Sequence, residues 1–296
     1  MRNLKGVLYL LLVLPITLLT LVMATLLAIL KLVIPVEKWQ WFCTALLLAV
    51  AETWAVTCRL FYRWVHAPQW DVQTLQGLTR EHWYLLVCNH QSWSDIPILL
   101  FVLGRRISVF RFFVKRQLLW VPVVGLACWA MEYPFMRRYR REQLDANPAL
   151  RSKDQQATQQ FCERMQNHPA TIVNYLEGTR FTRSKHDRQA SPYRHLLKPK
   201  SGGVAYVVTH LGERIRELID VTIVYPQAKG FWAFLCGDLG DVRVRMQRRE
   251  VPERLKQGDY QNCDVFRDEF QQWIATLWQE KDELIERELG SKPNPR

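Results

Sequence analysis

A histidine and a carboxylate stand five residues apart where one apolar segment of the chain gives way to another. His90 and Asp95 lie in the stretch NHQSWSD, after the apolar residues 83–88 and before the apolar residues 96–103. On one continuous helix, side chains five residues apart point about 140° away from each other, so the chain must turn for these two to meet. After such a turn, the carboxylate can accept a hydrogen bond from one imidazole nitrogen and leave the other nitrogen free as a general base.

This turn is expected at the junction of a strand and a helix. Residues 83–88, WYLLVC, are typical of a buried strand, and Ser94 is placed to cap a helix that begins at Asp95. The histidine would then lie in the loop and the aspartate in the first helical turn. A histidine beside an aspartate is also the ordinary pattern of a satisfied polar pair or a helix cap, so the rest of the chain has to decide between the two interpretations.

The segment EGTR, residues 177–180, forms a second polar loop. It follows residues 170–176, whose β-branched and aromatic side chains predict a strand. Glycine lets a backbone approach a ligand closely, Thr179 offers a hydroxyl and an amide, and Arg180 offers a planar fork of donors suited to a phosphate. Taken alone, the same four residues are also the pattern of a tight turn with a surface arginine.

Two basic segments add further groups that bind phosphate. Residues 133–141, YPFMRRYRR, place Phe135 three residues before Arg138 within a cluster of arginines. Residues 198–203, KPKSGG, have the composition of a phosphate-binding loop. The first segment is also typical of a solvated or membrane-facing basic patch, and the second of an ordinary turn, so neither is decisive by itself.

Predicted strands recur along the chain after about residue 66. Besides residues 83–88 and 170–176, a strand is predicted over residues 220–226, and residues 243–247 alternate in the manner of an edge strand.

Helical segments separate these strands. Residues 154–166 carry apolar side chains four positions apart, and Pro169 ends this predicted helix. A longer helix over about residues 264–289 is expected to pack on the domain or on a membrane. The apolar residues that share its face are Phe266, Phe270, Trp273, Ile274, Leu277, Leu284 and Ile285. Strands alternating with helices predict an α/β fold, with a mixed central sheet flanked by helices.

Composition narrows the class of partner. The chain has 296 residues and a net charge of +12, from 40 Lys and Arg against 28 Asp and Glu. Such a balance favours an anionic partner, whether nucleic acid, an acidic membrane face or a phosphorylated substrate. The seven cysteines are scattered without metal-ligand spacing, which is typical of reduced thiols in a protein that faces the cytosol.

The N-terminal sequence predicts membrane association. Residues 7–30 carry no charge and exceed the roughly 20 residues that cross a bilayer core, so they are predicted to form a membrane-spanning helix. The run is too long for the apolar core of a signal peptide. Residues 41–58 carry one charge and are interpreted either as a return span or as a helix lying in the membrane interface. We therefore expect membrane-anchoring helices over residues 1–65 and a single α/β domain over residues 66–296.

Taken in order, the polar motifs resemble those of one family, the glycerolipid acyltransferases related to bacterial 1-acylglycerol-3-phosphate acyltransferase of the PlsC type. That family is marked by NHxxxxD, FxxR, EGTR and a strand that ends in proline. The matching residues are Asn89, His90 and Asp95; Phe135 and Arg138; Glu177, Gly178, Thr179 and Arg180; and VTIVYP ending at Pro226. The resemblance covers nearly the whole chain and is closest to the inner-membrane subgroup called YihG in enteric bacteria.

The resemblance implies a role for each of these residues. His90 would remove the proton from an acceptor hydroxyl, and Asp95 would hold its imidazole in the correct tautomer. Arg138 and Arg180 would hold the acceptor's phosphate in a site shaped by residues 177–179. Pro226 and its strand would line the side of the acyl chain or its carrier.

The same resemblance implies the substrates and the location. The acceptor would be a lysophospholipid, most simply 1-acyl-sn-glycerol-3-phosphate, and the donor an acyl-CoA or an acyl-carrier protein, with no metal and no further cofactor. The domain would face the cytoplasm at the bacterial inner membrane.

Three departures from the family pattern bear on the acceptor. Glu132 stands where the second motif often has glycine, and it brings a negative charge close to the expected phosphate site. Leu176 replaces the usual proline before the third motif, and Gln117 replaces an acidic residue in the preceding segment. None of the three alters His90 or Asp95.

Other functions remain open at this point. The same chemistry would serve a different lysophospholipid acceptor. The net charge alone fits a membrane-tethered nucleic-acid-binding protein, although the aromatic residues lie in apolar segments rather than interleaved with arginine as a stacking platform. A catalytically inactive scaffold is disfavoured because His90 and Asp95 are both present.

Overall fold

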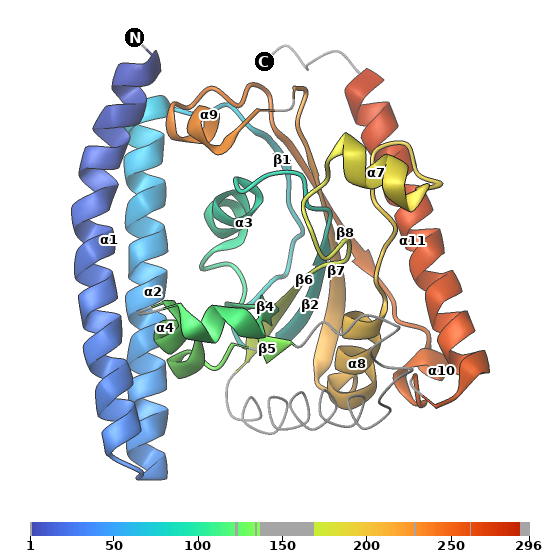
Figure 1. Ribbon diagram of the computed structural model, residues 1–296, viewed down its shortest axis with the longest axis horizontal. Coiled ribbons are helices and arrows are strands. Elements are labelled where there is room, and N and C mark those ends of the chain that lie inside the picture. Colours follow the sequence, from blue (N-terminus) through green and yellow to red (C-terminus); the bar gives the residue numbers. More distant parts are fainter. Residues whose placement is uncertain are drawn as a thin grey trace.

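The computed structural model describes residues 2–121, 124–133, 135–136, 169–227, 229–260 and 262–290. A helical hairpin stands beside an α/β domain whose sheet has helices on both faces (Figure 1). The predicted helix over residues 154–166 and the predicted site residue Arg138 lie outside the described residues.

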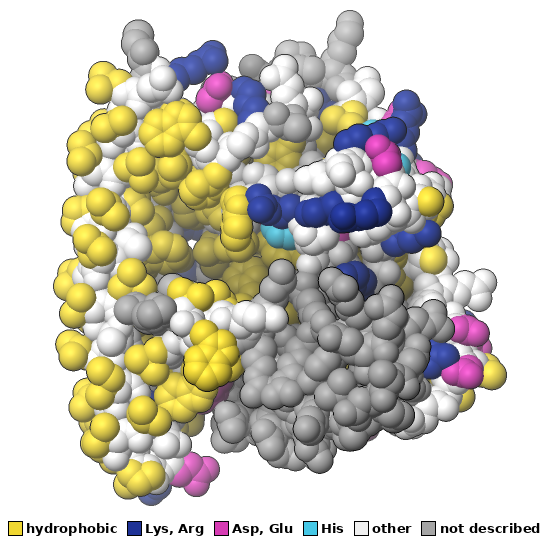
Figure 2. Space-filling model, in the orientation of Figure 1, with side chains coloured by type: hydrophobic (Ala, Val, Ile, Leu, Met, Phe, Trp, Pro, Cys, Tyr) yellow, Lys and Arg dark blue, Asp and Glu magenta, His cyan; other side chains and the backbone are white. Residues whose placement is uncertain are grey.

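The two apolar N-terminal segments form the hairpin, which consists of α1 (Arg2–Val33) and α2 (Glu37–His66). By length and composition alone, both helices are able to cross a membrane. Leu11 and Leu18 of α1 are 65% and 55% exposed, and Figure 2 shows hydrophobic side chains along the free side of the hairpin. Apolar patches of this extent mark contacts with membranes or with other proteins.

The hairpin contacts the α/β domain at both of its ends. At the start of α1, Arg2 forms an ion pair with Asp238 at 3.1 Å, just beyond α9 (Phe231–Leu235). Gly6 lies directly against the domain, because a Cβ atom there would come within 2.6 Å of the Cys236 sulfur. The domain therefore flanks the hairpin along its length rather than hanging from one end.

A buried polar cluster joins the other end of α1 to the domain. Lys31 Nζ donates to Glu132 Oε1 at 2.8 Å, to Thr44 Oγ1 at 2.7 Å and to the Ala130 carbonyl at 3.0 Å, at the end of α4 (Val124–Ala130). Glu132 has a φ of 60°, a left-handed conformation that glycine adopts most readily. Its carboxylate is directed to α1, so the expected negative charge at a phosphate site is neutralised by Lys31.

Six strands form a mixed sheet in the order β1-β8-β7-β2-β6-β3, in which only the β7–β8 pair is antiparallel. The strands are β1 (Asp71–Gln73), β2 (Trp83–Cys88), β3 (Val109–Phe112), β6 (Ala170–Tyr175), β7 (Ile215–Val224) and β8 (Arg243–Arg249). A separate pair joins β4 (Val114–Lys115) to β5 (Phe135–Met136), next to the 3₁₀ helix η1 (Arg116–Trp120). The predicted α/β class with a mixed sheet is confirmed.

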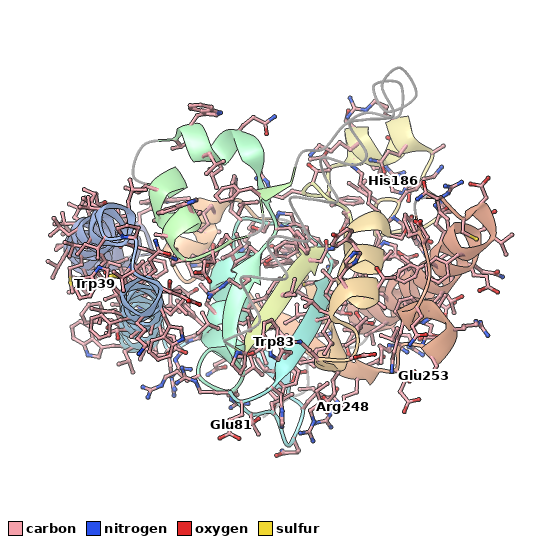
Figure 3. All side chains as sticks on the ribbon, turned by 90° about the horizontal axis from the view of Figure 1, so that it is seen from below. Trp39, Glu81, Trp83, His186, Arg248 and Glu253 are labelled. Carbon is pink, nitrogen blue, oxygen red and sulfur yellow. The ribbon has the colours of Figure 1, made fainter. Side chains whose placement is uncertain are left out.

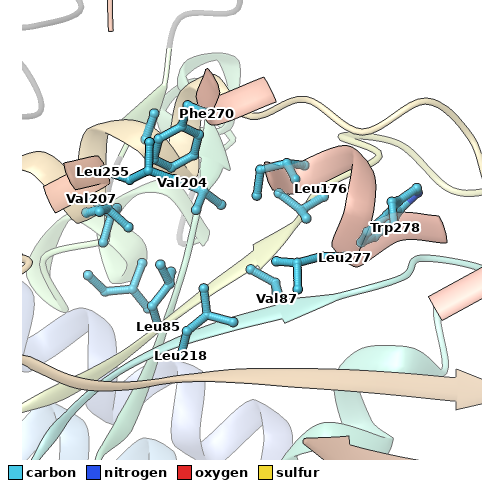
Figure 4. Close-up of a cluster of buried hydrophobic side chains, with 14 of the residues drawn as sticks. Leu85, Val87, Leu176, Val204, Val207, Leu218, Leu255, Phe270, Leu277 and Trp278 are labelled. Atoms are coloured by element: carbon cyan, nitrogen blue, oxygen red, sulfur yellow. The ribbon is translucent and has the colours of Figure 1, made fainter. Parts of the chain in front are cut away.

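Each face of the sheet has its own hydrophobic core. On one face, α8 (Gly202–Leu211), α10 (Glu253–Lys256) and α11 (Asp264–Gly290) pack against alternate residues of β2, among them Leu85 and Val87 (Figure 4). On the other face, α3 (Asp95–Leu103), α9 and the hairpin pack against the intervening residues. All six residues of β2 are buried, as expected of a central strand that is covered on both sides.

Figure 3 shows these layers from below, with the hairpin that carries Trp39 on one side and α7 (Arg183–Gln189), which carries His186, on the other. The sequence prediction was wrong on one point of the sheet. Residues 243–247 were expected at an edge, but β1 pairs with β8 and covers it. The three-residue β1 is too short to give a periodic signal, which explains the error.

Candidate active site

His90 and Asp95 meet across the loop that joins β2 to α3. Strand β2 ends at Cys88 and α3 begins at Asp95, as the sequence predicted. His90 Nδ1 lies 2.7 Å from Asp95 Oδ2. Asp95 is fully buried, whereas the His90 side chain keeps 14% exposure. Because Nδ1 faces the carboxylate, Nε2 is the ring nitrogen available to take a proton from a ligand.

The Asp95 carboxylate also shapes the loop that carries His90. Its Oδ2 atom accepts hydrogen bonds from the backbone amides of Gln91 at 2.8 Å and Ser92 at 2.9 Å. Ser94 occupies the N-cap position, but its hydroxyl bonds Ser92 Oγ at 3.1 Å instead of the helix backbone. Asp95, rather than Ser94, therefore supplies the side chain that orders this turn.

Asn89, directly after β2, continues the contact between β2 and β7 through its side chain. Its amide nitrogen donates to the Ile223 carbonyl at 2.8 Å, and its amide oxygen accepts from the Ile223 backbone nitrogen at 2.9 Å. This two-way contact holds the end of β7 against the start of the loop. It fixes His90, the next residue, relative to the sheet.

Glu177 supports the His90 loop through hydrogen bonds to the backbone. Its buried carboxyl accepts from the His90 backbone amide at 2.8 Å and from the Leu197 amide at 3.1 Å. Burial raises the pKa of Glu177 to about 8, against the effect of these two amide donors. The side chain therefore supports His90 rather than facing an open site.

The raised pKa of Glu177 predicts a dependence of stability on pH. The folded carboxyl titrates at about 8 and the unfolded one at about 4.5, so its stabilising contribution is full below pH 4.5 and is lost as the pH rises to 8. The expected loss is on the order of 5 kcal/mol. The check is the difference in thermal unfolding between the wild type and Glu177→Gln from pH 5 to pH 9, measured in detergent. A constant difference would contradict the assignment.

The EGTR loop is joined to the His90 loop by backbone and side-chain contacts. Gly178 has a φ of 67°, which a glycine adopts without strain. The Phe181 amide donates to the His90 carbonyl at 2.7 Å. Lys185 Nζ donates to Thr179 Oγ1 at 2.8 Å and to the Arg180 carbonyl at 2.9 Å. The two motifs thus form one connected unit.

Arg180 is held by an aromatic ring rather than by an acid. Its guanidinium carbon lies 4.5 Å from the centre of the Trp93 ring, in the loop between His90 and Asp95. Within the part of the chain that the structure describes, no carboxylate forms an ion pair with Arg180. Stacking on an aromatic face orders a guanidinium while leaving its N–H donors open to an anion.

An apolar cavity of about 490 Å³ lies between the hairpin and the domain, where Figure 2 shows a hollow with hydrophobic walls. Leu21 and Trp54 of the hairpin line it, and β3 contributes Phe110 and Phe112. Phe112 stacks on Tyr175 at 6.4 Å between ring centroids.

The cavity lies close to the His90–Asp95 pair. The Tyr175 ring, which Phe112 contacts from the cavity side, stacks on His90 at 4.2 Å between centroids. Ile96, the residue after Asp95, lines the cavity itself.

A family model described as acyltransferase matches residues 69–226, which include His90, Asp95, the EGTR loop and Pro226. The chain belongs to the acyltransferase family. The predicted family is therefore confirmed, and the match spans more than half of the chain.

Several acyltransferases are similar to this chain over most of its length. "1-acyl-sn-glycerol-3-phosphate acyltransferase 2" of Brassica napus is 25% identical over 240 residues, covering 76% of this chain and 56% of the relative. The gamma enzyme of that name from Mus musculus is 25% identical, covering 81% and 60%. "2-acyl-1-lysophosphatidylinositol acyltransferase" of Saccharomyces cerevisiae is 23% identical, covering 68% and 60%. The chain spans less than two thirds of the length of these relatives.

A solved acyltransferase shares the fold. The crystal structure of the 1-acyl-sn-glycerophosphate acyltransferase PlsC from Thermotoga maritima matches with a TM-score of 0.55 and 17% sequence identity, over 100% of both chains. The likeness includes the hairpin as well as the α/β domain, because the alignment covers the whole chain.

The remaining predicted residues of this acyltransferase-family chain take no part in the contacts described above. Pro226 follows β7 and is exposed, and the residues that line the apolar cavity do not include it. Phe135 begins β5, whereas Arg138 falls outside the described residues.

Three residues near the site were not singled out from the sequence. Trp93 and Lys185 position the EGTR loop, and Tyr225 donates a hydrogen bond to Asp95. Only Trp93, inside the NHxxxxD motif, carried a local signal. Among the described residues, no group of three or more His, Cys, Asp and Glu side chains is arranged to hold a metal ion.

Proposed function

We propose that this protein is a membrane-bound O-acyltransferase that moves a fatty acyl group from acyl-CoA or acyl-carrier protein to a lysophospholipid. The simplest acceptor is 1-acyl-sn-glycerol-3-phosphate, which would give phosphatidic acid. The observation that carries the proposal is the His90 imidazole, fixed by buried Asp95 beside both an arginine that stacks on Trp93 and an apolar cavity. A lysophospholipid presents a hydroxyl, a phosphate and an acyl chain, one for each of these features.

In the proposed transfer, His90 acts as the general base through its free ring nitrogen. Nε2 takes the proton of the acceptor hydroxyl while the oxygen attacks the carbonyl carbon of the thioester. The carbon–sulfur bond then breaks, and the leaving thiolate takes the proton from the imidazolium. Asp95 keeps Nδ1 protonated and stabilises the imidazolium that forms. The acceptor oxygen is itself the nucleophile, so no covalent acyl-enzyme is expected.

The phosphate and the acyl chain have separate binding regions. Arg180 directs its donors at the phosphate while Trp93 holds its plane, and Arg138 is proposed as a second donor. The cavity of about 490 Å³ falls in the range of roughly 300–1,000 Å³ that is usual for small-molecule sites. Its apolar walls suit an acyl chain.

The contacts at both ends of the hairpin favour a position along the membrane surface. α1 has 32 residues and is therefore about 48 Å long. The α/β domain contacts it near Arg2 and again near Lys31. A hairpin that crossed the bilayer would carry the domain's polar flank through a hydrocarbon core of roughly 30 Å, which is costly. We place the hairpin in one leaflet instead of the predicted span across the bilayer. The resemblance to the YihG subgroup favours a domain on the cytoplasmic side of a bacterial inner membrane.

An acceptor screen tests the proposed function. The purified full chain, in vesicles of phosphatidylethanolamine and phosphatidylglycerol, is given a labelled acyl-CoA and each of several lysophospholipids, and the products are identified by mass spectrometry. We expect phosphatidic acid from lysophosphatidate, and none with His90→Ala. If only another lysophospholipid gave a diacyl product, that lysophospholipid would be the acceptor in place of lysophosphatidate. No acyl transfer to any acceptor, from either acyl-CoA or acyl-carrier protein, would overturn the proposal.

A further inference from the structure

The Asp95 carboxylate has a second side that the His90 contact does not use. Its Oδ2 atom faces His90 and two backbone amides, whereas Oδ1 accepts a hydrogen bond from the Tyr225 hydroxyl at 2.5 Å. No other described residue bonds Oδ1. Asp95 is 0% exposed and Tyr225 is 8% exposed, so water does not readily substitute for the phenol.

The fold brings Tyr225 to this position from 130 residues away. Tyr225 directly follows β7, and Val221, Ile223 and Tyr225 belong to the core on the side of the sheet that α3 covers. Asn89 binds both backbone groups of Ile223, two residues earlier. The ends of β2 and β7 are therefore held together, and the phenol is aimed at the first residue of α3.

We propose that Tyr225 is a positioning residue that acts on His90 through Asp95. The inference rests on the proposed function, in which His90 is the general base. The Tyr225 hydroxyl holds one oxygen of the carboxylate so that the other faces Nδ1 of the imidazole. It also draws electron density from the carboxylate, which limits how strongly His90 retains a proton after the transfer.

The surroundings keep Tyr225 as a donor. Burial raises the pKa of its hydroxyl well above the usual value, and the nearby Asp95 carboxylate raises it further. The other titratable groups that act on this pair are Cys88 from β2, Tyr175 from β6 and Glu177 from the EGTR loop. Burial raises the pKa of each of them, so at neutral pH these groups favour their protonated forms, which add no negative charge beside Asp95.

Steady-state kinetics of Tyr225→Phe in the full chain test the role. Without the hydroxyl, Asp95 interacts more strongly with the imidazolium, so the acidic limb of the pH–rate profile moves up by about one unit, and kcat falls about tenfold. KM for the acyl donor and the lysophospholipid stays within twofold, because Tyr225 touches neither. An unchanged profile, or a loss expressed in KM alone, overturns the proposal.

Tyr84→Phe is the matched control. Tyr84 is a buried tyrosine of β2 whose hydroxyl accepts from the Thr79 amide at 3.0 Å, away from the pair. The same chemical change there leaves the pH–rate profile where it is. A shift of equal size in both variants would assign the effect to general loosening of the sheet.

A double-mutant cycle separates this proposal from the proposed function. Thermal unfolding in detergent is measured for Tyr225→Phe, Asp95→Asn and the double variant. If Tyr225 and Asp95 interact directly, the loss of stability in the double variant differs from the sum of the losses in the two single variants. Additive losses of stability would overturn the proposed link. This readout needs no activity. A protein that transfers no acyl group but shows the coupling refutes the proposed function and leaves the Tyr225–Asp95 link standing.

Discussion

Replacement of His90 by alanine is expected to lower the rate of acyl transfer by at least ~10²- to 10⁴-fold, the usual contribution of a positioned general base. The fold should survive, because the ring is partly exposed and the loop is held by the backbone contacts of His90 with Glu177 and Phe181. The measurement is product formation from a radiolabelled acyl donor, with near-wild-type thermal unfolding as the check on folding.

His210→Ala is the matched control for this experiment. His210 is exposed on α8, where its ring stacks on Tyr206 at 3.9 Å between centroids. Its loss should leave the transfer rate within about twofold, because it touches neither the loop nor the cavity. If His90→Ala formed as much product as the wild type, the assignment of His90 as the general base would be wrong.

Replacement of Lys281 by methionine is expected to destabilise the fold by roughly 3–5 kcal/mol, since it leaves a buried carboxylate without its main partner. Lys281, on α11, is 1% exposed and forms an ion pair with Asp220, which is 3% exposed. It also donates to the Val221 carbonyl at 2.7 Å and to Thr222 Oγ1 at 3.0 Å. Unfolding in detergent by heat or denaturant measures the loss.

The companion variant Asp220→Asn decides the cause. In combination with Lys281→Met it should recover much of the lost stability, because the uncompensated charge is then gone. Lys256→Met, in a pair with exposed Glu253, should change stability by less than about 1 kcal/mol. If the double variant lost as much stability as the two single variants together, the unpaired charge would not be the cause of the destabilisation.

The sequence predicted the elements around the site because their signals are local. The apolar run WYLLVC, the serine before Asp95 and the polar residues between them specify a strand, a loop and a helix within fifteen residues. The structure contains β2 and α3 at those positions and brings His90 to Asp95. The family followed from four short motifs in order, and it is confirmed.

The supporting contacts were not predictable in the same way. Tyr225, Glu177 and Lys281 reach their partners only when distant segments of the chain meet, and a single sequence carries no pairing information of that kind. Glu132 shows the limit most clearly. Its charge suggested a conflict with a phosphate, whereas its partner, Lys31, lies 101 residues earlier. The subgroup, the acceptor and the role of Arg138 stay predictions.

The hairpin supplies one wall of the apolar cavity as well as a broad exposed apolar surface. Removing residues 1–66 would therefore open the apolar cavity and leave the Glu132 carboxylate without its ion-pair partner, Lys31. The hairpin and the α/β domain therefore form one structural unit around this cavity. If the cavity holds the acyl chain as proposed, substitutions in the hairpin would change the chain length that fits, although a hydropathy plot assigns these residues only to the membrane.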